Sequence, residues 1–501
     1  MKQAIEDPAG TTADRVSLFL EKSVNRYGTD PLTQKWGHYE PDGPARGFVA
    51  AGLLARYPEI ARDSIHTAVA AHDLHGVNTF LKKNPGLAND RSVFDGWTPL
   101  LRLAYARLPI ETANVLAIAT VLLDAGADPN ACWSDEANAF TPLVGVIGGG
   151  EADQSAHPMA EAFALLLIAR GADPFAPQAL YNTSLGRDST FWLDLLWLES
   201  AKRGETHKWT GPAPDALGGE KIPNALAYLL GNAVPNHINR ARWLLEHGAD
   251  ARGINFYSRE PVIKHAVLAG SKDMVELLVR YGATPPQLSE EEKFLMAVGQ
   301  GDLMLVRQLA LIHPDFLSNH HAMFLAIRMH RVDIVETLLN LGMSVDVGDE
   351  QNFRALHFTT HCGAAQIARL LIARGAQIDP FELRYGGTPL SHAVYNKRAE
   401  MVDLLAAHSC NFCGLCFAGA VDRLRALLVQ DPDLANRQER PGEPALFCLP
   451  DDPAKAVEVA RLLLSCGADP HFQNPLGQTA AQGARRRGLD EAAALLEAAQ
   501  R

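Results

Sequence analysis

The stretch LLEHGADAR, residues 244–252, decides the fold because variants of it return along the chain. The other copies are LLDAGADPN from Leu122, LLIARGADPF from Leu166, LLVRYGATP from Leu277, LLIARGAQID from Leu370 and LLLSCGADPH from Leu462. Gly248 and Gly282, the glycines of two successive copies, lie 34 residues apart. A period of this length is typical of a repeat array, in which each unit packs against its neighbours.

A second phrase follows most of these glycines at a fixed distance. Its copies are WTPL (97–100), FTPL (140–143), RALHFTT (354–360), GTPLSHA (387–393) and GQTAAQGA (477–484). The two phrases, recurring in phase, resemble the ankyrin repeat, whose signature includes T-P-L-H-x-A. The resemblance implies an all-α solenoid of stacked helix-turn-helix units with short β-hairpin loops. Units that replace G-A-D by a proline-containing turn, such as residues 422–436, resemble a common variant, and with them the array holds about a dozen repeats.

The residues of both phrases have physical reasons to recur. A glycine directly after an amphipathic helix can end it, because glycine adopts the left-handed conformation without a Cβ clash. The glycines predicted to do this are Gly126, Gly171, Gly248, Gly282, Gly375 and Gly467. The threonine of T-P-L can cap the next helix with its hydroxyl group, and proline at the first helical position loses no hydrogen bond. Thr98, Thr141 and Thr388 are therefore predicted N-caps.

The composition predicts a folded protein in the cytoplasm. Of 501 residues, 47% are apolar and 21% are charged, which is ample material for a buried core. The net charge of −12 disfavours nucleic acid as a partner, since phosphate binding needs a basic surface. The N-terminus MKQAIEDPAG lacks the apolar segment of a secretion signal, and the longest apolar runs are too short to span a membrane. The abundance of alanine, leucine and arginine looks bacterial.

The cysteines raise the question of a metal or redox site. The chain has seven cysteines, and Cys410, Cys413 and Cys416 lie three residues apart. A small and odd number argues against a disulfide framework and for a reducing compartment. A structural zinc site needs four ligands, and no fourth has the usual spacing, although His408 or Cys448 could approach in the fold. The favoured interpretation is small buried side chains without metal or cofactor, and a metal- or redox-responsive site is the alternative.

Catalytic motifs are absent from the sequence. His357 and His361 lie four residues apart, as in a zinc-protease helix, but Phe358 stands where the general base should be. His357 occupies the histidine position of T-P-L-H-x-A, where the resemblance implies a structural bond to the neighbouring loop. No G-x-S-x-G, P-loop or dinucleotide-binding glycine motif is present. Enzymatic activity is therefore disfavoured, although scattered residues could still assemble an active site.

Two segments depart from the repeat. Residues 1–60 are expected to form an N-terminal helical cap, with a helix over about 12–27, before the array at 61–501. An insertion at about 176–225 concentrates aromatic residues, among them Trp192 and Trp197. Packing of an extra helix would explain these tryptophans. The alternative is a partner anchor, because tryptophan is enriched at binding hot spots.

The resemblance implies a protein that binds other proteins through its hairpin tips and the concave surface of its first helices. By alignment with the repeat, the tip residues are Trp97, Phe353 and Tyr385, and the concave residues are Arg102, His265, Arg328, His361 and Tyr395. The favoured function is a non-catalytic scaffold for a folded protein partner. An inhibitor or immunity-type role is one hypothesis, because an acidic surface would suit a basic target. The rival is an enzyme or small-molecule binder with a pocket between the insertion and the concave surface.

Overall fold

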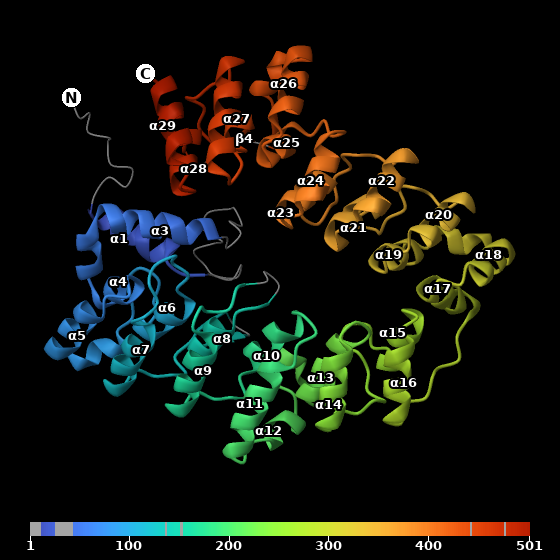
Figure 1. Cartoon of the computed structure of the whole chain (residues 1–501), viewed down its shortest axis with the longest axis horizontal. Coiled ribbons are helices and arrows are strands. Elements are labelled where there is room, and N and C mark those ends of the chain that lie inside the picture. Colours follow the sequence, from blue (N-terminus) through green and yellow to red (C-terminus); the bar gives the residue numbers. More distant parts are fainter. Residues whose placement is uncertain (1–11, 26–43, 136–137, 151–153, 441–442, 475–476) are drawn as a thin grey trace. The chain divides into compact units, whose positions relative to one another are not determined.

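The computed structural model describes residues 12–25, 44–135, 138–150, 154–440, 443–474 and 477–501 (Figure 1). The chain divides into two compact units. The N-terminal unit comprises residues 1–265 and 273–285, and the C-terminal unit comprises residues 266–272 and 286–501. Nearly all regular structure in the described residues is helical, as predicted. None of the described helices is both long and apolar enough to cross a membrane.

Pairs of short helices build the N-terminal unit, and the first helices of successive pairs pack on one another in a row. This first-helix row contains α4 (Ile65–Ala70), α6 (Pro99–Tyr105), α8 (Pro142–Ile147), α10 (Pro177–Ser184) and α13 (Ala225–Ala233). The second helices are α5 (Leu74–Lys83), α7 (Val115–Asp124), α9 (Ala160–Ala169), α11 (Phe191–Lys202) and α14 (Ile238–Glu246). A further pair consists of α15 (Val262–Leu268) and α16 (Lys272–Arg280), and the short α12 (His207–Thr210) follows α11. Because α10 packs between α8 and α13, the first part of the segment 176–225 continues the row.

The N-terminal segment lies against the start of this row. Helix α1 (Thr12–Lys22) packs on α3 (Pro44–Arg56) and on α4, and the 3₁₀ helix η1 (Pro58–Arg62) contacts both α3 and α4. Phe19 of α1, Ala50 of α3 and Ile60 of η1 belong to one buried apolar cluster. Helix α1 starts at the predicted residue but ends at Lys22, so the predicted end near residue 27 is wrong. Sequence reasoning missed α3.

The C-terminal unit repeats the same arrangement of helix pairs. Its first helices are α17 (Glu290–Gln300), α19 (His320–Arg328), α21 (Ala355–Cys362), α23 (Pro389–Tyr395), α25 (Phe412–Ala418) and α28 (Ala480–Arg486). Its second helices are α18 (Leu303–Ile312), α20 (Val332–Asn340), α22 (Ala365–Ala373), α24 (Ala399–Ala406), α26 (Val421–Gln430), α27 (Pro453–Ser465) and α29 (Asp490–Ala499). One first helix is shortened to the 3₁₀ helix η7 (Ala445–Phe447), which contacts both α25 and α28.

The predicted helix ends are confirmed. The six glycines of the G-A-D phrase have φ angles between 85° and 102°, a region that side chains with a Cβ rarely adopt. The hydroxyl of Thr98 accepts the N–H of Leu101, and that of Thr388 accepts the N–H of Ser391. Thr141 stands at the N-cap position without such a side-chain bond. Local chemistry therefore fixes where most of these helices begin and end.

The connections between repeats are short turns and hairpins. Two antiparallel strand pairs occur in the described residues, β1 (Trp133–Asp135) with β2 (Asn138–Phe140) and β3 (Gln438–Arg440) with β4 (Glu443–Pro444). The remaining 3₁₀ helices are η2 (Pro85–Asn89), η3 (Asp215–Leu217), η4 (Gly219–Lys221), η5 (Pro314–Ser318) and η6 (Pro432–Ala435). Asparagines join one repeat to the next: Asn89 Nδ2 donates to the carbonyl of Gly126 at 2.6 Å, and Asn436 Nδ2 donates to that of Gly467 at 2.8 Å.

Candidate protein-binding surface

Two predicted contact residues lie in the interior of the N-terminal unit. Trp97 is 2% exposed and Arg102 is 0% exposed. Arg102 Nη2 donates to both carboxylate oxygens of Asp95, at 2.7 Å each, and Arg102 Nη1 donates to the carbonyl of Leu20 at 2.9 Å. The Asp95 side chain is itself 2% exposed. The prediction that Trp97 is an exposed tip and that Arg102 faces an open concave surface is therefore wrong.

The N-terminal segment and a hairpin cause this burial. Leu20, the acceptor for Arg102, belongs to α1, and the N–H of Asn25 donates to the carbonyl of Tyr105 at 2.9 Å. On the hairpin side, the rings of Trp97 and Trp133 stack with their centroids 5.8 Å apart. Residues far away in the sequence therefore occupy the surface that repeat alignment alone would leave open.

His265 is half-buried in α15 of the N-terminal unit. Its Nε2 lies 2.7 Å from the hydroxyl oxygen of Ser258, in the turn before the helix. Burial lowers the pKa of His265, so the ring is neutral at physiological pH.

The tryptophans of the segment 176–225 take part in an aromatic cluster. Trp192 and Trp197 are both half-buried on α11. Trp197 meets Trp209 and Trp243 edge to face, with centroid distances of 5.3 Å and 5.8 Å. Trp243 Nε1 donates to a carboxylate oxygen of Asp194 at 2.7 Å. These contacts attach α11 to α14, so packing accounts for Trp197 without a ligand.

Three predicted contact residues come together in the C-terminal unit. Arg328, at the end of α19, places its guanidinium carbon 5.5 Å from the ring centroid of Phe358 in α21. The rings of His361 and Phe353 each lie 6.3 Å from the ring of Phe358. Phe358 is only 9% exposed, whereas Arg328 and His361 are exposed. A buried aromatic ring therefore supports exposed polar side chains from two neighbouring repeats.

The next repeat extends this surface with two tyrosines. Tyr385, in the hairpin before α23, is 72% exposed, and Tyr395, at the end of α23, is 53% exposed. His392 of α23 contacts the previous repeat, because its ring lies 5.5 Å from that of Phe353. We call this surface the aromatic-cationic strip, and it consists of Arg328, Phe353, Phe358, His361, Tyr385, His392 and Tyr395.

A buried carboxylate holds the hairpin that carries Tyr385. Glu382 is 1% exposed, and its side-chain oxygens accept the N–H groups of Arg384, Tyr385 and Gly387 at 2.7, 2.9 and 3.0 Å. Burial by itself would raise the pKa of Glu382, but these hydrogen bonds outweigh it and hold the pKa below its usual value. The carboxylate is thus ionised and organises the tip before any partner arrives.

Sequence alignment named only Tyr385 at this tip and missed two apolar neighbours. Phe381 is 49% exposed and Leu383 is 70% exposed. The N–H of Leu383 donates to the carbonyl of Gln351 at 2.7 Å, and Asn352 Nδ2 donates to the carbonyl of Phe381 at 2.6 Å. The tip is therefore fixed to the preceding hairpin. The alternation of apolar and charged residues in FELRY was the available signal.

His357 has the structural role that the resemblance implied. It is 0% exposed, its Nδ1 accepts the N–H of Arg354 at 3.1 Å, and its Nε2 donates to the carbonyl of Pro380 in the next hairpin at 3.1 Å. Burial, with a smaller contribution from His392, lowers the pKa of His357 to about 4. The neutral imidazole therefore links one repeat to the next.

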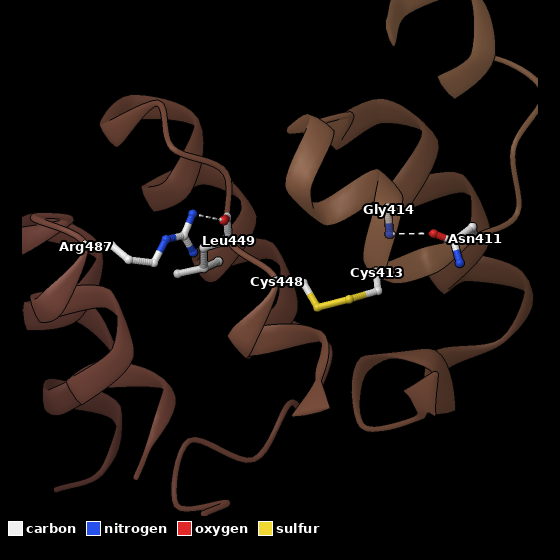
Figure 2. The surroundings of a disulfide bond; sticks show 6 residues. All are labelled: Asn411, Cys413, Gly414, Cys448, Leu449 and Arg487. Carbon is white, nitrogen blue, oxygen red and sulfur yellow. Dashed lines mark hydrogen bonds between the residues drawn. A yellow bond between two sulfur atoms is a disulfide. The ribbon is translucent and has the colours of Figure 1, made fainter. Parts of the chain in front are cut away.

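The cysteines differ from the sequence-based interpretation. Cys413 of α25 and Cys448, directly after η7, form a disulfide bond (Figure 2). The two residues are 35 apart, about one repeat period, so the bond joins the first-helix positions of neighbouring repeats. The prediction that Cys413 is a reduced core side chain is therefore wrong, because η7 brings Cys448 beside it. Cys416 is buried, as predicted, and Cys410 is exposed.

Hydrogen bonds surround the disulfide on both sides. Asn411 Oδ1 accepts the N–H of Gly414 at 2.7 Å and caps α25, and Arg487 donates to the carbonyl of Leu449 at 2.6 Å (Figure 2). Because the Cys413 sulfur is bonded, the three evenly spaced cysteines do not form a set of thiolate ligands. Within the described part of the chain, no group of three His, Cys, Asp or Glu side chains is placed to hold a metal ion.

Comparisons with known proteins agree with this architecture. A family model described as ankyrin repeats matches residues 294–382 in three copies. The B-cell lymphoma 3 protein homolog of Mus musculus is 28% identical over 164 residues, which cover 32% of this chain and 31% of that protein. Ankyrin repeat protein nuc-2 of Neurospora crassa is 29% identical over 161 residues, which cover 30% of this chain and 14% of that protein. The matches thus span less than a third of each relative.

A solved ankyrin repeat domain from Acinetobacter baumannii is also similar, with 21% identity, a TM-score of 0.29, and coverage of 36% of this chain and 99% of that domain. The family match and the curated relatives show that the chain contains ankyrin repeats and has the all-helical ankyrin-repeat fold. Ankyrin repeats generally bind other proteins.

Proposed function

We propose that the chain is a non-catalytic scaffold that binds a folded protein through the aromatic-cationic strip and the hairpin tip at 381–387. The observation that carries this proposal is the exposure of Tyr385 and Tyr395 on a rigid support. Exposed aromatic side chains bury a large area on binding and lose little conformational entropy, so they are frequent hot spots. The hydrogen bonds of Glu382 already order the tip, so the tip loses less conformational entropy on binding.

Further parts of the proposal concern the number of repeats, the biological role and the cellular compartment. We propose about a dozen repeats over 61–501 with residues 1–60 as a cap, and a role as an inhibitor or immunity-type protein in a bacterial cytoplasm. The exposed thiol of Cys410 suits a reducing compartment, whereas a disulfide is more typical of an oxidising one. Lysis of the cells in denaturant that contains an alkylating reagent decides between them, because the unfolded chain exposes the buried Cys413 and Cys448 and only reduced thiols are labelled. Labelling of Cys413 and Cys448 without reductant supports the cytoplasm, and their protection argues for an oxidising compartment.

Affinity capture from the native host, followed by mass spectrometry, tests the proposed function. The wild type is compared with the variant His361→Ala/Tyr385→Ala/Tyr395→Ala. The matched control is Tyr257→Ala, which removes a tyrosine that is 60% exposed in the N-terminal unit. We expect a stoichiometric protein partner that the triple variant loses and the control retains. A partner that the triple variant still captures would contradict binding by the strip.

A further inference from the structure

Three cations and one histidine come from three successive repeats of the aromatic-cationic strip. Arg328 ends α19, His361 lies near the end of α21, and Lys397 and Arg398 follow α23. All four side chains are exposed. Arg398 Nη2 donates to the carbonyl oxygen of His361 at 3.5 Å, and the charges of Arg328 and Arg398 both act on the His361 ring, so residues of three successive repeats meet here. We call these four residues the cationic cluster.

The acidic residue next to His392 in the strip, Glu382, is buried and bonded to its own hairpin. The first helices α19, α21 and α23 contain no aspartate or glutamate. Arg331, which occupies the repeat position equivalent to Arg398, pairs with Asp333 at 2.6 Å. The equivalent acid after Arg398 is Glu400, and it pairs with Arg369 at 2.8 Å instead. Among the described residues, no acid forms an ion pair with any member of the cationic cluster.

The lowered pKa of His361 is consistent with an excess of positive charge around its ring. Partial desolvation of the His361 ring by its neighbours lowers its pKa most, and the charges of Arg398 and Arg328 lower it further. At neutral pH the imidazole is therefore uncharged, and the arginines and Lys397 supply the positive potential. Arg328 at the end of α19 also suits the negative end of that helix dipole, but the dipole does not explain Arg398, which is the N-cap of α24 and lies at the positive end of that helix.

We propose that the cationic cluster binds an acidic segment of the partner protein, with Tyr395 receiving an apolar side chain of the same segment. This inference rests on the proposed function, since the strip must first be the protein-binding surface. It reverses the charge preference that the overall acidity suggests, because the local charge of the strip is opposite to the net charge of −12. A long polyanion such as nucleic acid would meet repulsion from the rest of the chain, whereas a short acidic segment contacts only the cluster.

Peptides selected from a random display library for binding to the full-length protein test whether the cationic cluster prefers acidic segments. The tightest selected peptide is then measured by fluorescence anisotropy against the wild type, the double variant Arg328→Glu/Arg398→Glu and the control Arg307→Glu. Arg307 is exposed on the second helix α18 of the same unit, so its reversal makes a similar change in charge outside the strip. Circular dichroism verifies that each variant is folded.

We expect selected peptides enriched in aspartate and glutamate. Their affinity should fall at least about tenfold in the double variant and change less than about twofold in the control, and salt should weaken binding. Replacement of the acids in the peptide by their amides should have a similar effect to the double variant. Peptides without acid enrichment, peptides that bind the double variant equally well, or the failure to select any peptide would each overturn the inference.

A labelled single-stranded oligonucleotide serves as the competing source of negative charge. If it binds more tightly than the selected peptide and loses affinity in the double variant, the choice of an acidic protein segment is wrong. The capture experiment separates this inference from the proposed function. A partner that depends on Tyr385 and Tyr395 but tolerates Arg328→Glu/Arg398→Glu leaves the function in place and removes only the acidic segment.

Discussion

Tyr105 and Tyr395 occupy the same place in two different repeats but have different surroundings. Each follows its capping threonine, Thr98 or Thr388, by seven residues and ends a first helix. Tyr105 is 1% exposed because its ring packs against Gly145 of α8 and its hydroxyl bonds to the carbonyl of Thr141, whereas Tyr395 is 53% exposed. The phase of a repeat therefore indicates on which face a residue lies. Its exposure depends on what else in the chain covers that face.

The largest expected change in stability follows from loss of the buried ion pair between Arg102 and Asp95, in the region that the N-terminal segment covers. Arg102→Ala leaves Asp95 buried without its guanidinium, which should destabilise the N-terminal unit by about 3–5 kcal/mol. Arg328→Ala, on the open strip, should change stability by less than about 0.5 kcal/mol. All seven tryptophans precede residue 244, so denaturation followed by tryptophan fluorescence reports on the N-terminal unit. Similar stabilities for wild type and Arg102→Ala would refute the covered-region account.

The disulfide should stabilise only the unit that carries the strip. A bond that closes a loop of 35 residues is expected to contribute about 3–4 kcal/mol, chiefly by restricting the unfolded chain. Cys413→Ser should therefore lower the stability of the C-terminal unit, measured by far-ultraviolet circular dichroism, and leave the tryptophan transition unchanged. Cys410→Ser, at an exposed thiol, is the control. No difference between Cys413→Ser and the control would contradict a contribution from the bond.

Both units should lose stability in weak acid. Burial lowers the pKa of His357 to about 4, and burial with the nearby Arg107 lowers that of His157 to about 3. Each histidine favours its neutral form in the folded state, so stability is complete above pH 6.5 and is lost as the pH falls toward these values. For His357 the loss should reach roughly 3 kcal/mol at most. His357→Gln should flatten this part of the stability profile of the C-terminal unit, and an unchanged slope would count against the assignment.

The smallest expected change in stability comes from removing the hydroxyl of each of the two equivalent tyrosines. The hydroxyl of Tyr105 donates to the carbonyl of Thr141 at 3.2 Å. Tyr105→Phe should therefore lower the free energy of unfolding of the N-terminal unit by about 1 kcal/mol. Tyr395→Phe, at an exposed side chain, should cost less than about 0.5 kcal/mol. Urea denaturation with the probe suited to each unit measures both values. Equal costs would show that exposure does not distinguish these positions.

Most of the fold could be predicted from short sequence motifs. The glycine and threonine positions predicted the helix ends because φ preferences and caps involve only a few neighbouring residues. The structural bond of His357 was likewise available from its place in the repeat. The shortened helix η7 was not predicted, although Pro450, three residues after its end, disfavours a helical conformation at Leu449 and was the available signal.

The candidate surface was only partly predictable, because exposure is a non-local property. Nothing near Trp97 or Arg102 indicates that α1 and the hairpin at 133–140 cover them. The pairing of Cys413 with Cys448 depends on the stacking of two repeats, and single-sequence spacing does not reveal it. In contrast, Arg328 and His361 could be placed on the strip from repeat phase alone, since no distant segment covers these exposed side chains.

Hydrogen exchange of the full chain, with and without its captured partner, tests most directly whether the strip is the binding surface. We predict slower exchange in the complex at residues 320–330, 353–363 and 381–398, and no change around Tyr257 and His265 in the N-terminal unit. This pattern would place the partner on the aromatic-cationic strip. Protection confined to the N-terminal unit, or to the second helices of the C-terminal unit, would contradict the account.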